Sequence, residues 1–273
     1  YCCTNPTHAN ERTRQRQRRA QVIDLRQGDC LEVMKTIPDG SIDLVLTDPP
    51  YGTTANKWDS VIDSKEMWKE LKRVVKPNGA ILLFGSEPFS TYLRMGNLEN
   101  YKYDIYWLKN KVTGFTQAKN KPMKNLELIS VFSDGTTVHK TQSKNRMTYN
   151  PQGLTLLNKV KKNGKGKFGN IAGERPSHKD NYVQEFTNYP KMTVEFEVEH
   201  GLHPTQKPVP LLEYLIKTYT NEGEVVLDFT AGSMSTAIAC INTNRKGIMI
   251  EKDPHYFKIG SERVEKALSE KGD

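Results

Sequence analysis

The 273-residue sequence predicts an α/β fold built on a doubly wound, mostly parallel sheet. Three observations support this prediction. Short apolar runs of strand length alternate with amphipathic segments of helix length along most of the chain. Two of the apolar runs end in polar residues, as expected where strand ends form a binding crevice in an open α/β sheet. The length suffices for one large domain with an inserted lobe.

The first half of the chain alternates strands and helices up to residue 132. Glycine and proline set the boundaries, because Asp39-Gly40 ends the first predicted helix and Pro77-Asn78-Gly79 ends the second. The predicted strands cover 22–25, 42–46, 80–84, 103–107 and 126–132. The predicted helices begin at Leu31, Glu66 and Phe89.

Regular patterning returns at residue 203. Pro208 opens an apolar helix that runs to Tyr219, since proline is favoured in the first helical turn. The segments that follow predict a strand at 224–229, a helix at 237–241, a strand at 247–251 and a helix at 256–268.

Two stretches lack this patterning. Residues 1–20 hold five arginines among Gln and Thr and predict a disordered basic tail. Residues 133–202 show no clear helical period and are rich in Gly, Asn and Lys, which predicts an inserted recognition region. The regular part is thereby divided into residues 21–132 and 203–273.

Positive charge is concentrated in one segment. The chain carries a formal net charge of +8, but Lys102 to Phe168 alone contain fourteen Lys and Arg against three Asp and Glu. That segment sums to +11, so the remaining residues sum to about −3. Such an asymmetry favours a polyanionic partner, and nucleic acid is the expected one.

Composition also bears on membranes, redox chemistry and metals. There is no run of 18 apolar residues and no signal-peptide pattern, so a cytoplasmic protein is expected. The four cysteines form neither a disulfide framework nor a zinc-binding spacing, so no metal is expected. The first residue is Tyr1 rather than Met, which suggests that the true start lies elsewhere.

A rigid turn follows the apolar run 42–46. Asp48-Pro49-Pro50-Tyr51 places a carboxylate, carbonyl groups and an aromatic ring directly after a buried strand. Proline cannot donate a ladder hydrogen bond and disfavours helix at the preceding residue, so these carbonyls stay unpaired. A polar turn that only ends a strand is the alternative, so the rest of the chain must decide.

A βαβ unit near the C-terminal end has the pattern of a nucleotide site. The loop Asp228-Phe229-Thr230-Ala231-Gly232-Ser233 precedes a helix, and the next strand ends at Glu251, nineteen residues after Gly232. An acidic residue ~20 residues beyond such a loop accepts hydrogen bonds from ribose hydroxyls. Helix capping is the alternative role for Glu251. Because the loop lacks G-x-G-x-x-G and the chain lacks a P-loop, dinucleotides and triphosphates fit poorly.

Three separated motifs resemble those of the amino-methylating DNA methyltransferases of phages and bacteria. Asp48-Pro49-Pro50-Tyr51 resembles their catalytic motif and the 228–233 loop their S-adenosylmethionine loop. His203-Pro204-Thr205-Gln206-Lys207-Pro208 resembles the cofactor-contacting segment before that loop. In addition to these three motifs, Trp107 to Glu127 resembles the family's central block. The motif order is similar to that of the beta group, and the resemblance covers about residues 22–268.

The resemblance implies a Rossmann-like, doubly wound, mostly parallel seven-stranded methyltransferase sheet. Residues 21–132 would form the catalytic half, 133–202 an inserted target-recognition region and 203–273 the cofactor-binding half. The implied activity is site-specific transfer of a methyl group from S-adenosyl-L-methionine to the N6 amine of adenine in DNA. The implied partner is duplex DNA with the target base flipped, and no metal is needed. A homodimer and a cognate restriction endonuclease are further partners that the resemblance allows.

The predicted site residues fall into three groups, of which the resemblance implies the first two and the basic excess between Lys102 and Phe168 supports the third. The catalytic group is Asp48, Pro49, Pro50 and Tyr51. The cofactor-binding group is Asp29, Thr205, Lys207, Asp228, Phe229, Gly232, Ser233 and Glu251. The DNA-binding group is Lys109, Lys111, Lys119, Lys161, Lys162, Lys165 and Lys167. Helix capping explains Asp29 equally well, and an ordinary surface role is the alternative for Lys207.

Two residues bear on the alternatives to adenine methylation. Relatives that methylate the N4 amine of cytosine more often have Ser in place of Asp48, so Asp48 favours adenine. Family members usually have a second glycine where this chain has Met234, so a catalytically impaired DNA-binding relative is a further alternative. The presence of Asp48, Tyr51 and Glu251 argues against that alternative. We expect the Met234 side chain to point into the packing between helix and sheet.

Overall fold

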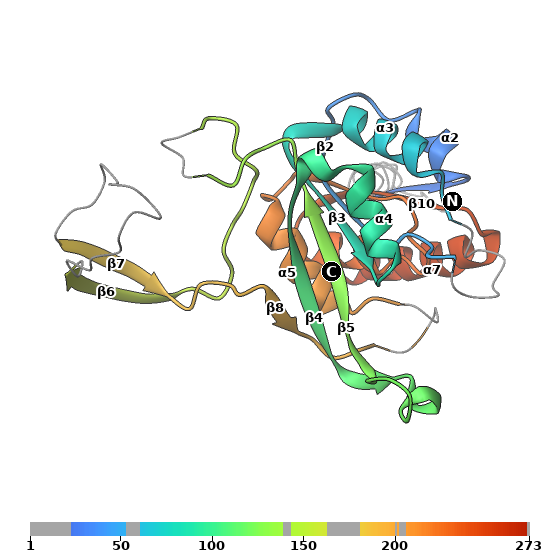
Figure 1. The fold of residues 1–273 in the computed structure, drawn as a ribbon. Coiled ribbons are helices and arrows are strands. Elements are labelled where there is room, and N and C mark those ends of the chain that lie inside the picture. The colour runs from blue at the N-terminus through green and yellow to red at the C-terminus, as the bar shows by residue number, and fades with distance from the viewer. Residues whose placement is uncertain are drawn as a thin grey trace, which may run out of the picture. The chain divides into compact units, whose positions relative to one another are not determined.

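The computed structural model describes residues 23–52, 61–138, 143–162, 181–199, 201 and 206–271 (Figure 1). The chain divides into two compact units. One unit comprises residues 1–150 and 192–273, and the other comprises Pro151–Lys191. The second unit lies within the range 133–202 that the sequence predicts as an insertion.

An eight-stranded sheet forms the centre of the first unit. The strand order is β1-β10-β9-β2-β3-β5-β4-β8, and only β5 runs antiparallel to its neighbours. The doubly wound, mostly parallel sheet is therefore confirmed, with one strand more than the seven expected. The strands are β1 (Ile23–Gln27), β2 (Ile42–Thr47), β3 (Val75–Gly85), β4 (Tyr101–Thr113), β5 (Lys124–Phe132), β8 (Thr193–Glu195), β9 (Val225–Asp228) and β10 (Lys246–Glu251).

The additional strand is β8, which pairs in parallel with β4. Three residues are too short to carry a periodic signal, so sequence patterning misses this strand. Two predicted boundaries are also wrong. β3 begins at Val75 rather than residue 80 and passes through Pro77-Asn78-Gly79, where its pairing with β2 is irregular. β4 continues to Thr113 because its outer end is paired with β5 although it is exposed and polar.

Helices cover both faces of the sheet (Figure 1). Successive residues of β2 point to opposite faces, because side chains alternate along a strand. Leu44 and Leu46 pack with one helical layer, and Val45 packs with the other. The first layer contains α5 (Val209–Tyr219), α6 (Ser235–Asn242) and α7 (Pro254–Glu270). The second contains α2 (Cys30–Met34), α3 (Ser64–Val74) and α4 (Phe89–Gly96).

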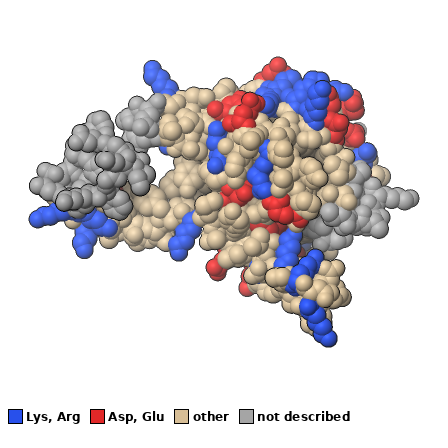
Figure 2. Space-filling view, viewed as in Figure 1, with Lys and Arg blue, Asp and Glu red and all other residues tan. Residues whose placement is uncertain are grey.

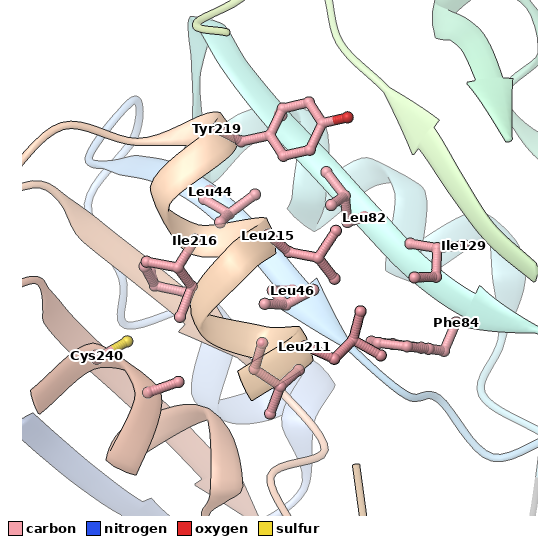
Figure 3. Packing of buried hydrophobic residues seen from close by; sticks show 14 of the residues in the cluster. Leu44, Leu46, Leu82, Phe84, Ile129, Leu211, Leu215, Ile216, Tyr219 and Cys240 are labelled. Atoms are coloured by element: carbon pink, nitrogen blue, oxygen red, sulfur yellow. The ribbon is translucent and has the colours of Figure 1, made fainter. Parts of the chain in front are cut away.

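The α5 helix anchors the first layer to the centre of the sheet. Leu211 and Leu215 point from this helix toward Leu46 of β2 and Phe84 of β3 (Figure 3). All four side chains are at most 1% exposed. Full burial of one such side chain contributes ~1.5–3 kcal/mol, so this contact fixes the position of the chain segment just before α5.

The order of the strands places a crevice between β2 and β9. β2 lies between β3 and β9 and is parallel to both. From β2 the chain proceeds to β3 on one side, whereas from β9 it proceeds to β10 on the other. Ligands bind at such a switch point, outside the carboxyl ends of the strands. The two loops with predicted functional residues follow β2 and β9.

The second unit contains an antiparallel pair of strands, β6 (Thr155–Lys162) and β7 (Asn181–Thr187). The sequence predicted no regular structure there. Every residue of β6 is exposed, so there is no alternation between apolar and polar positions to reveal the strand.

Met234 occupies a left-handed backbone position just before α6. Its φ is 61° and its ψ is 33°, a conformation that costs a residue other than glycine ~1–2 kcal/mol. The side chain is fully buried, and a Cβ atom added to Gly260 of α7 would lie 2.2 Å from its Cγ. The expectation that Met234 points into the helical packing is confirmed. The backbone angle also explains why glycine suits this position.

We expect Met234→Gly to be more stable than Met234→Ala by ~1 kcal/mol, because glycine relieves the left-handed strain while both remove the same packing. Met234→Ala should itself lower the free energy of unfolding by ~2–4 kcal/mol. Urea denaturation of the three proteins measures both differences. If Met234 had a helical backbone instead, the alanine variant would be more stable than the glycine variant. A higher free energy of unfolding for Met234→Ala than for Met234→Gly would therefore contradict the left-handed conformation.

Candidate active site

A cavity of about 560 Å³ opens at the carboxyl ends of β2 and β9. Ligand sites have volumes of ~300–1,000 Å³, so the cavity can hold a nucleoside-sized molecule. Its wall includes eleven of the predicted catalytic and cofactor-binding residues. These are Asp29, Asp48, Pro49, Pro50, Tyr51, Lys207, Asp228, Phe229, Gly232, Ser233 and Glu251. Thr205 lies outside the described residues.

Asp48 is the centre of a buried cluster of charged groups. Its Oδ1 accepts a hydrogen bond of 2.6 Å from the Tyr51 hydroxyl, and its Oδ2 forms an ion pair with the Lys207 ammonium. Glu127 of β5 joins the cluster through Oε1, which lies 3.1 Å from the Tyr51 oxygen and 3.2 Å from Lys207 Nζ. Lys109 of β4 lies 2.5 Å from Glu127 Oε2. We call Asp48, Tyr51, Lys109, Glu127 and Lys207 the Asp48 cluster.

The two carboxyl groups of this cluster differ in acidity. Burial raises the pKa of Asp48, and the nearby Glu127 charge adds to that rise although Lys207 opposes it. Burial also disfavours ionisation of Glu127, but Lys207 and Lys109 outweigh it and lower its pKa to about 2. The difference follows from the ion pairs, because Glu127 contacts two ammonium groups and Asp48 contacts one.

The cluster changes the interpretation of two lysines. Lys109 is predicted to bind DNA, but the structure pairs its ammonium with Glu127 and places it 4.6 Å from the Trp107 ring centre. Lys207 is predicted to bind the cofactor; it lines the larger cavity, and its ammonium contacts Asp48 and Glu127. Its side chain is only 11% exposed, and these two carboxylates hold its pKa well above the usual range despite burial.

A second network joins the ends of β2 and β9. The buried Asp228 carboxylate accepts hydrogen bonds from the hydroxyls of Thr47, at 2.7 Å, and Thr236, at 2.6 Å. Burial raises the pKa of Asp228 to about 6 despite these bonds. The Thr230 hydroxyl donates to the backbone carbonyl of Asp48 at 3.1 Å. The loop after β9 thereby fixes the backbone of the turn after β2.

Glu251 connects the loop after β9 to the end of β10. Its two carboxylate oxygens accept hydrogen bonds of 2.7 Å from the backbone N–H groups of Gly232 and Asp253. Burial raises its pKa, although these bonds oppose the rise. Each oxygen keeps a second lone pair, and the side chain lines the cavity. Capping and ligand binding are therefore compatible roles for Glu251.

The other predicted cofactor residues shape the cavity wall. Asp29 caps α2 by accepting a hydrogen bond of 3.0 Å from the Leu31 N–H and pairs with Lys252 at 3.1 Å. Gly232 has a φ of 51°, a left-handed angle that favours glycine. Because glycine has no side chain, its backbone itself forms part of the cavity wall. Phe229 is almost fully buried and belongs to the core on the α3 side of the sheet.

A second cavity of about 380 Å³ shares the Asp48 turn as a wall. Pro49, Pro50 and Tyr51 line both cavities. Phe89 and Tyr92 of α4 contribute aromatic surface to the second cavity, and the Phe89 ring centre lies 4.8 Å from that of Tyr51. The turn therefore separates two adjoining spaces, of which the smaller is largely apolar.

The remaining predicted DNA-binding lysines lie in different places. Lys111 and Lys119 are exposed near the tip of the hairpin formed by β4 and β5, where Figure 2 shows blue side chains together. Lys161 and Lys162 are exposed on β6 in the second unit. Lys165 and Lys167 lie outside the described residues. At the hairpin tip, Phe115 is 81% exposed beside these lysines.

Sequence reasoning named Glu127 only as part of the central block, without a role in the site, and did not single out Thr47. Glu127 is 76 residues from Tyr51 along the chain, so spacing gives no sign of their contact. In an alignment, a buried acidic residue within an otherwise apolar strand is the signal that could have found Glu127. Thr47 ends an apolar strand, and its contact with Asp228 requires the β2–β9 pairing.

Metal sites and membrane spans were sought over the described ranges. Within them, no three His, Cys, Asp or Glu side chains converge to hold a metal ion. None of the helices described is long and apolar enough to cross a bilayer.

Solved structures with a similar fold include two that cover most of this chain. The M1.HpyAVI complex with S-adenosylmethionine has a TM-score of 0.58 and 24% identity, covering 88% of this chain and 99% of that chain. The PvuII cytosine-N4-specific DNA methyltransferase has a TM-score of 0.61 and 15% identity, covering 91% of this chain and 92% of that one. At these identities the comparison establishes a shared fold.

Curated relatives are similar over most of the chain. The DNA adenine methyltransferase YhdJ of Escherichia coli is 29% identical, with 88% of this chain and 82% of the relative covered. The type II methyltransferase M.HpaI of Haemophilus parainfluenzae is 26% identical, with 87% and 72% covered.

The family comparison gives the most direct assignment. A model of the N6/N4 methyltransferase family, described as DNA methylase, matches residues 42–262. This range includes the Asp48 turn, Glu127, the loop after β9 and Glu251. Because the match extends over well more than half of its length, the chain belongs to the family of S-adenosylmethionine-dependent N6/N4 DNA methyltransferases.

Proposed function

We propose that this protein methylates the exocyclic N6 amine of adenine at a specific site in duplex DNA. The observation that carries the proposal is the position of the Asp48 turn between two adjoining cavities. Asp48 lines the larger cavity, where the methyl donor would bind, next to the wall of Pro49, Pro50 and Tyr51 that this cavity shares with the smaller one. Its carboxylate can therefore bind an amine that enters past this wall.

The larger cavity suits S-adenosylmethionine in both volume and chemistry. Glu251 offers carboxylate lone pairs to a ribose, as acidic residues at the end of the second strand do in nucleotide-binding folds. Gly232 brings backbone to the wall, where a side chain would crowd the ligand. Met234 does not line the cavity, so it leaves this space open. When bound, the cofactor supplies an electrophilic methyl group on a sulfonium.

The residues of the turn act on the target amine. The lone pair of an adenine amine is delocalised into the ring, which makes the nitrogen a poor nucleophile. Asp48 and the Pro49 carbonyl accept hydrogen bonds from its two protons and favour a tetrahedral nitrogen with a localised lone pair. The Thr230 hydroxyl and the two prolines hold these acceptors in place. Positioning of this kind supplies ~7–11 kcal/mol.

The target base enters by rotation out of the duplex. An amine inside stacked DNA is out of reach, so enzymes that modify bases extrude the nucleotide into a pocket. Tyr51 and Phe89 provide aromatic surface on the wall of the smaller cavity, where an extruded base can stack.

Asp48 and one named relative favour adenine over cytosine. Relatives that act on cytosine more often have Ser at this position, and a hydroxyl is a weaker acceptor than a carboxylate. YhdJ is named as an adenine methyltransferase, and its similarity spans 88% of this chain. Methylation at N4 of cytosine is the alternative, favoured by the fold shared with the PvuII enzyme.

DNA binding involves lysines in both units. The β4–β5 hairpin places Lys111, Lys119 and Lys121 beyond the end of the sheet that carries the Asp48 cluster. We propose Pro151–Lys191, with its basic β6 strand, as the core of the target-recognition region. A cytoplasmic location, a homodimer and a restriction partner remain predictions.

We expect Asp48→Asn to reduce methyl transfer by ~100-fold or more while S-adenosylmethionine affinity changes little, because the variant loses the charged acceptor for the amine. Transfer is measured with a tritiated methyl donor, and affinity by calorimetry.

Asp43→Asn is the matched control, because Asp43 is a buried, ion-paired carboxylate at the opposite end of β2. Its transfer rate should stay near that of the wild type in the folded protein. Near-normal turnover of Asp48→Asn would remove the catalytic role of the turn.

Glu251→Gln should weaken S-adenosylmethionine binding by ~1–3 kcal/mol, because a neutral amide pairs less well with ribose hydroxyls than a carboxylate does. Isothermal calorimetry measures the change. Glu224→Gln, at the start of β9 and away from the cavity, serves as the control. If both variants bind with wild-type affinity, Glu251 acts only as a cap.

Replacing Lys111, Lys119 and Lys121 together with Gln should make the log–log dependence of DNA affinity on salt shallower by ~2–3, one per lost phosphate contact. Fluorescence anisotropy at several salt concentrations gives the slope. A control replaces Lys217, Lys246 and Lys266, which are exposed elsewhere in the same unit. Equal slopes for the two triple variants would exclude the hairpin from the DNA interface.

A further inference from the structure

Protein donors already occupy both oxygens of the Asp48 carboxylate. The Tyr51 hydroxyl donates to Oδ1 at 2.6 Å, and the Lys207 ammonium contacts Oδ2. The proposed function requires the same carboxylate to accept a hydrogen bond from the target amine. Each oxygen keeps a second lone pair, so the amine can bind there, and Asp48 is a stronger acceptor for the amine when one of these donors weakens its hold.

Glu127 lies where both donors can find a second acceptor. Its Oε1 is 3.1 Å from the Tyr51 oxygen and 3.2 Å from Lys207 Nζ. Both distances lie within or just at hydrogen-bonding range, and both exceed the 2.6 Å between Tyr51 and Asp48. The donors are thus held mainly by Asp48, with Glu127 as the alternative partner.

The Tyr51 hydroxyl can exchange partners without a large movement. A phenol carries one proton, so it donates fully to one carboxylate at a time. Rotation about the C–O bond of Tyr51 turns the hydroxyl hydrogen from Asp48 toward Glu127, and the hydrogen stays bonded to the Tyr51 oxygen. The ring itself stays in place, because the Phe89 ring packs against it at 4.8 Å.

Lys109 keeps Glu127 charged and in position. Its ammonium lies 2.5 Å from Glu127 Oε2, and it also lies over the ring of the buried Trp107. The Trp107 N–H is fixed by a hydrogen bond of 2.8 Å to the Phe196 carbonyl. With two carboxylates and two ammonium groups, the Asp48 cluster carries no net charge, as a buried cluster requires.

We propose that Glu127 is a positioning residue that accepts the Tyr51 hydroxyl, and a larger share of Lys207, when Asp48 exchanges these donors for the target amine. The proposal rests on the proposed function, because it concerns the same amine. The proposal gives Glu127, on β5, a part in the reaction that the Asp48 turn performs.

The acidities of the two carboxyl groups suit this exchange. With a pKa of about 2, Glu127 is an ionised acceptor at any working pH. The pKa of Asp48 is raised instead, so Asp48 is the group that loses its charge first as the pH falls. The charged or titratable groups around Asp48 are Tyr51, Lys109, Lys124, Glu127, Lys207 and Asp228.

The first test compares Glu127→Gln with the wild type in steady-state methylation of duplex DNA. We expect kcat to fall by ~10-fold or more, with S-adenosylmethionine affinity within about twofold of the wild type. The acid limb of the kcat profile should also move to lower pH. Glu127 raises the pKa of Asp48, so removing its charge lets Asp48 stay ionised at lower pH.

Asp104→Asn is the matched control for this test. Asp104 is a buried carboxylate on β4 that pairs with Arg94 and accepts a hydrogen bond from Ser130 of β5. The Asp104→Asn substitution should lower the free energy of unfolding without moving the acid limb of the kcat profile. Glu127→Asp keeps the charge, so it should leave the limb near its wild-type position even where kcat falls.

The second test combines Glu127→Gln with Tyr51→Phe, which keeps the ring and removes the hydroxyl that competes for Asp48. We expect Glu127→Gln to reduce kcat by a smaller factor in the Tyr51→Phe background than in the wild type. This non-additivity is required if the hydroxyl exchanges between the two carboxylates, because Glu127 then acts through the Tyr51 hydroxyl.

Three outcomes overturn the inference. They are an unchanged kcat for Glu127→Gln, an acid limb of its kcat profile that does not move, and an equal fold-loss of kcat on adding Glu127→Gln to the wild type and to Tyr51→Phe. In each case the wild type still methylates adenine, so the proposed function stands. A wild type that transfers no methyl group to adenine contradicts the proposed function itself.

Discussion

The structure depends on keeping a carboxylate charged in a largely buried place at the end of β2. Burial of Asp48 would favour its neutral form, and only the ammonium group of Lys207 and the Tyr51 hydroxyl make its charge tolerable. Supporting Lys207 brings in Glu127, and Glu127 in turn requires Lys109. The position of this one carboxylate thus determines the polarity of neighbouring segments on β4, β5 and the chain before α5.

The sheet makes this arrangement possible by joining two distant loops. The order of strands places β2 beside β9, so the turn after one and the loop after the other share a wall. Thr230 holds the Asp48 backbone, and Asp228 joins Thr47 to Thr236 across the same edge. These contacts hold the turn after β2 and the loop after β9 in a fixed geometry relative to each other.

The sequence predicted the parts of the molecule whose signals are local. Burial on both faces made residues 44–46 of β2 an apolar run, and the prolines after the strand marked the turn. The pairing of Lys109 and Lys207 with Glu127 was missed because it depends on contacts between residues far apart in the chain. The exposed β6 strand was missed because its residues show no buried face. The left-handed angle of Met234 was also hidden, since the residue type argues against it.

Identification of the methylated nucleoside tests the central claim most directly. Duplex DNA is incubated with the protein and S-adenosylmethionine, digested to nucleosides and separated by chromatography with mass detection. The account predicts N6-methyladenine as the product with the wild-type protein. N4-methylcytosine as the main product, or unmodified DNA from a folded protein that binds the cofactor, would contradict it.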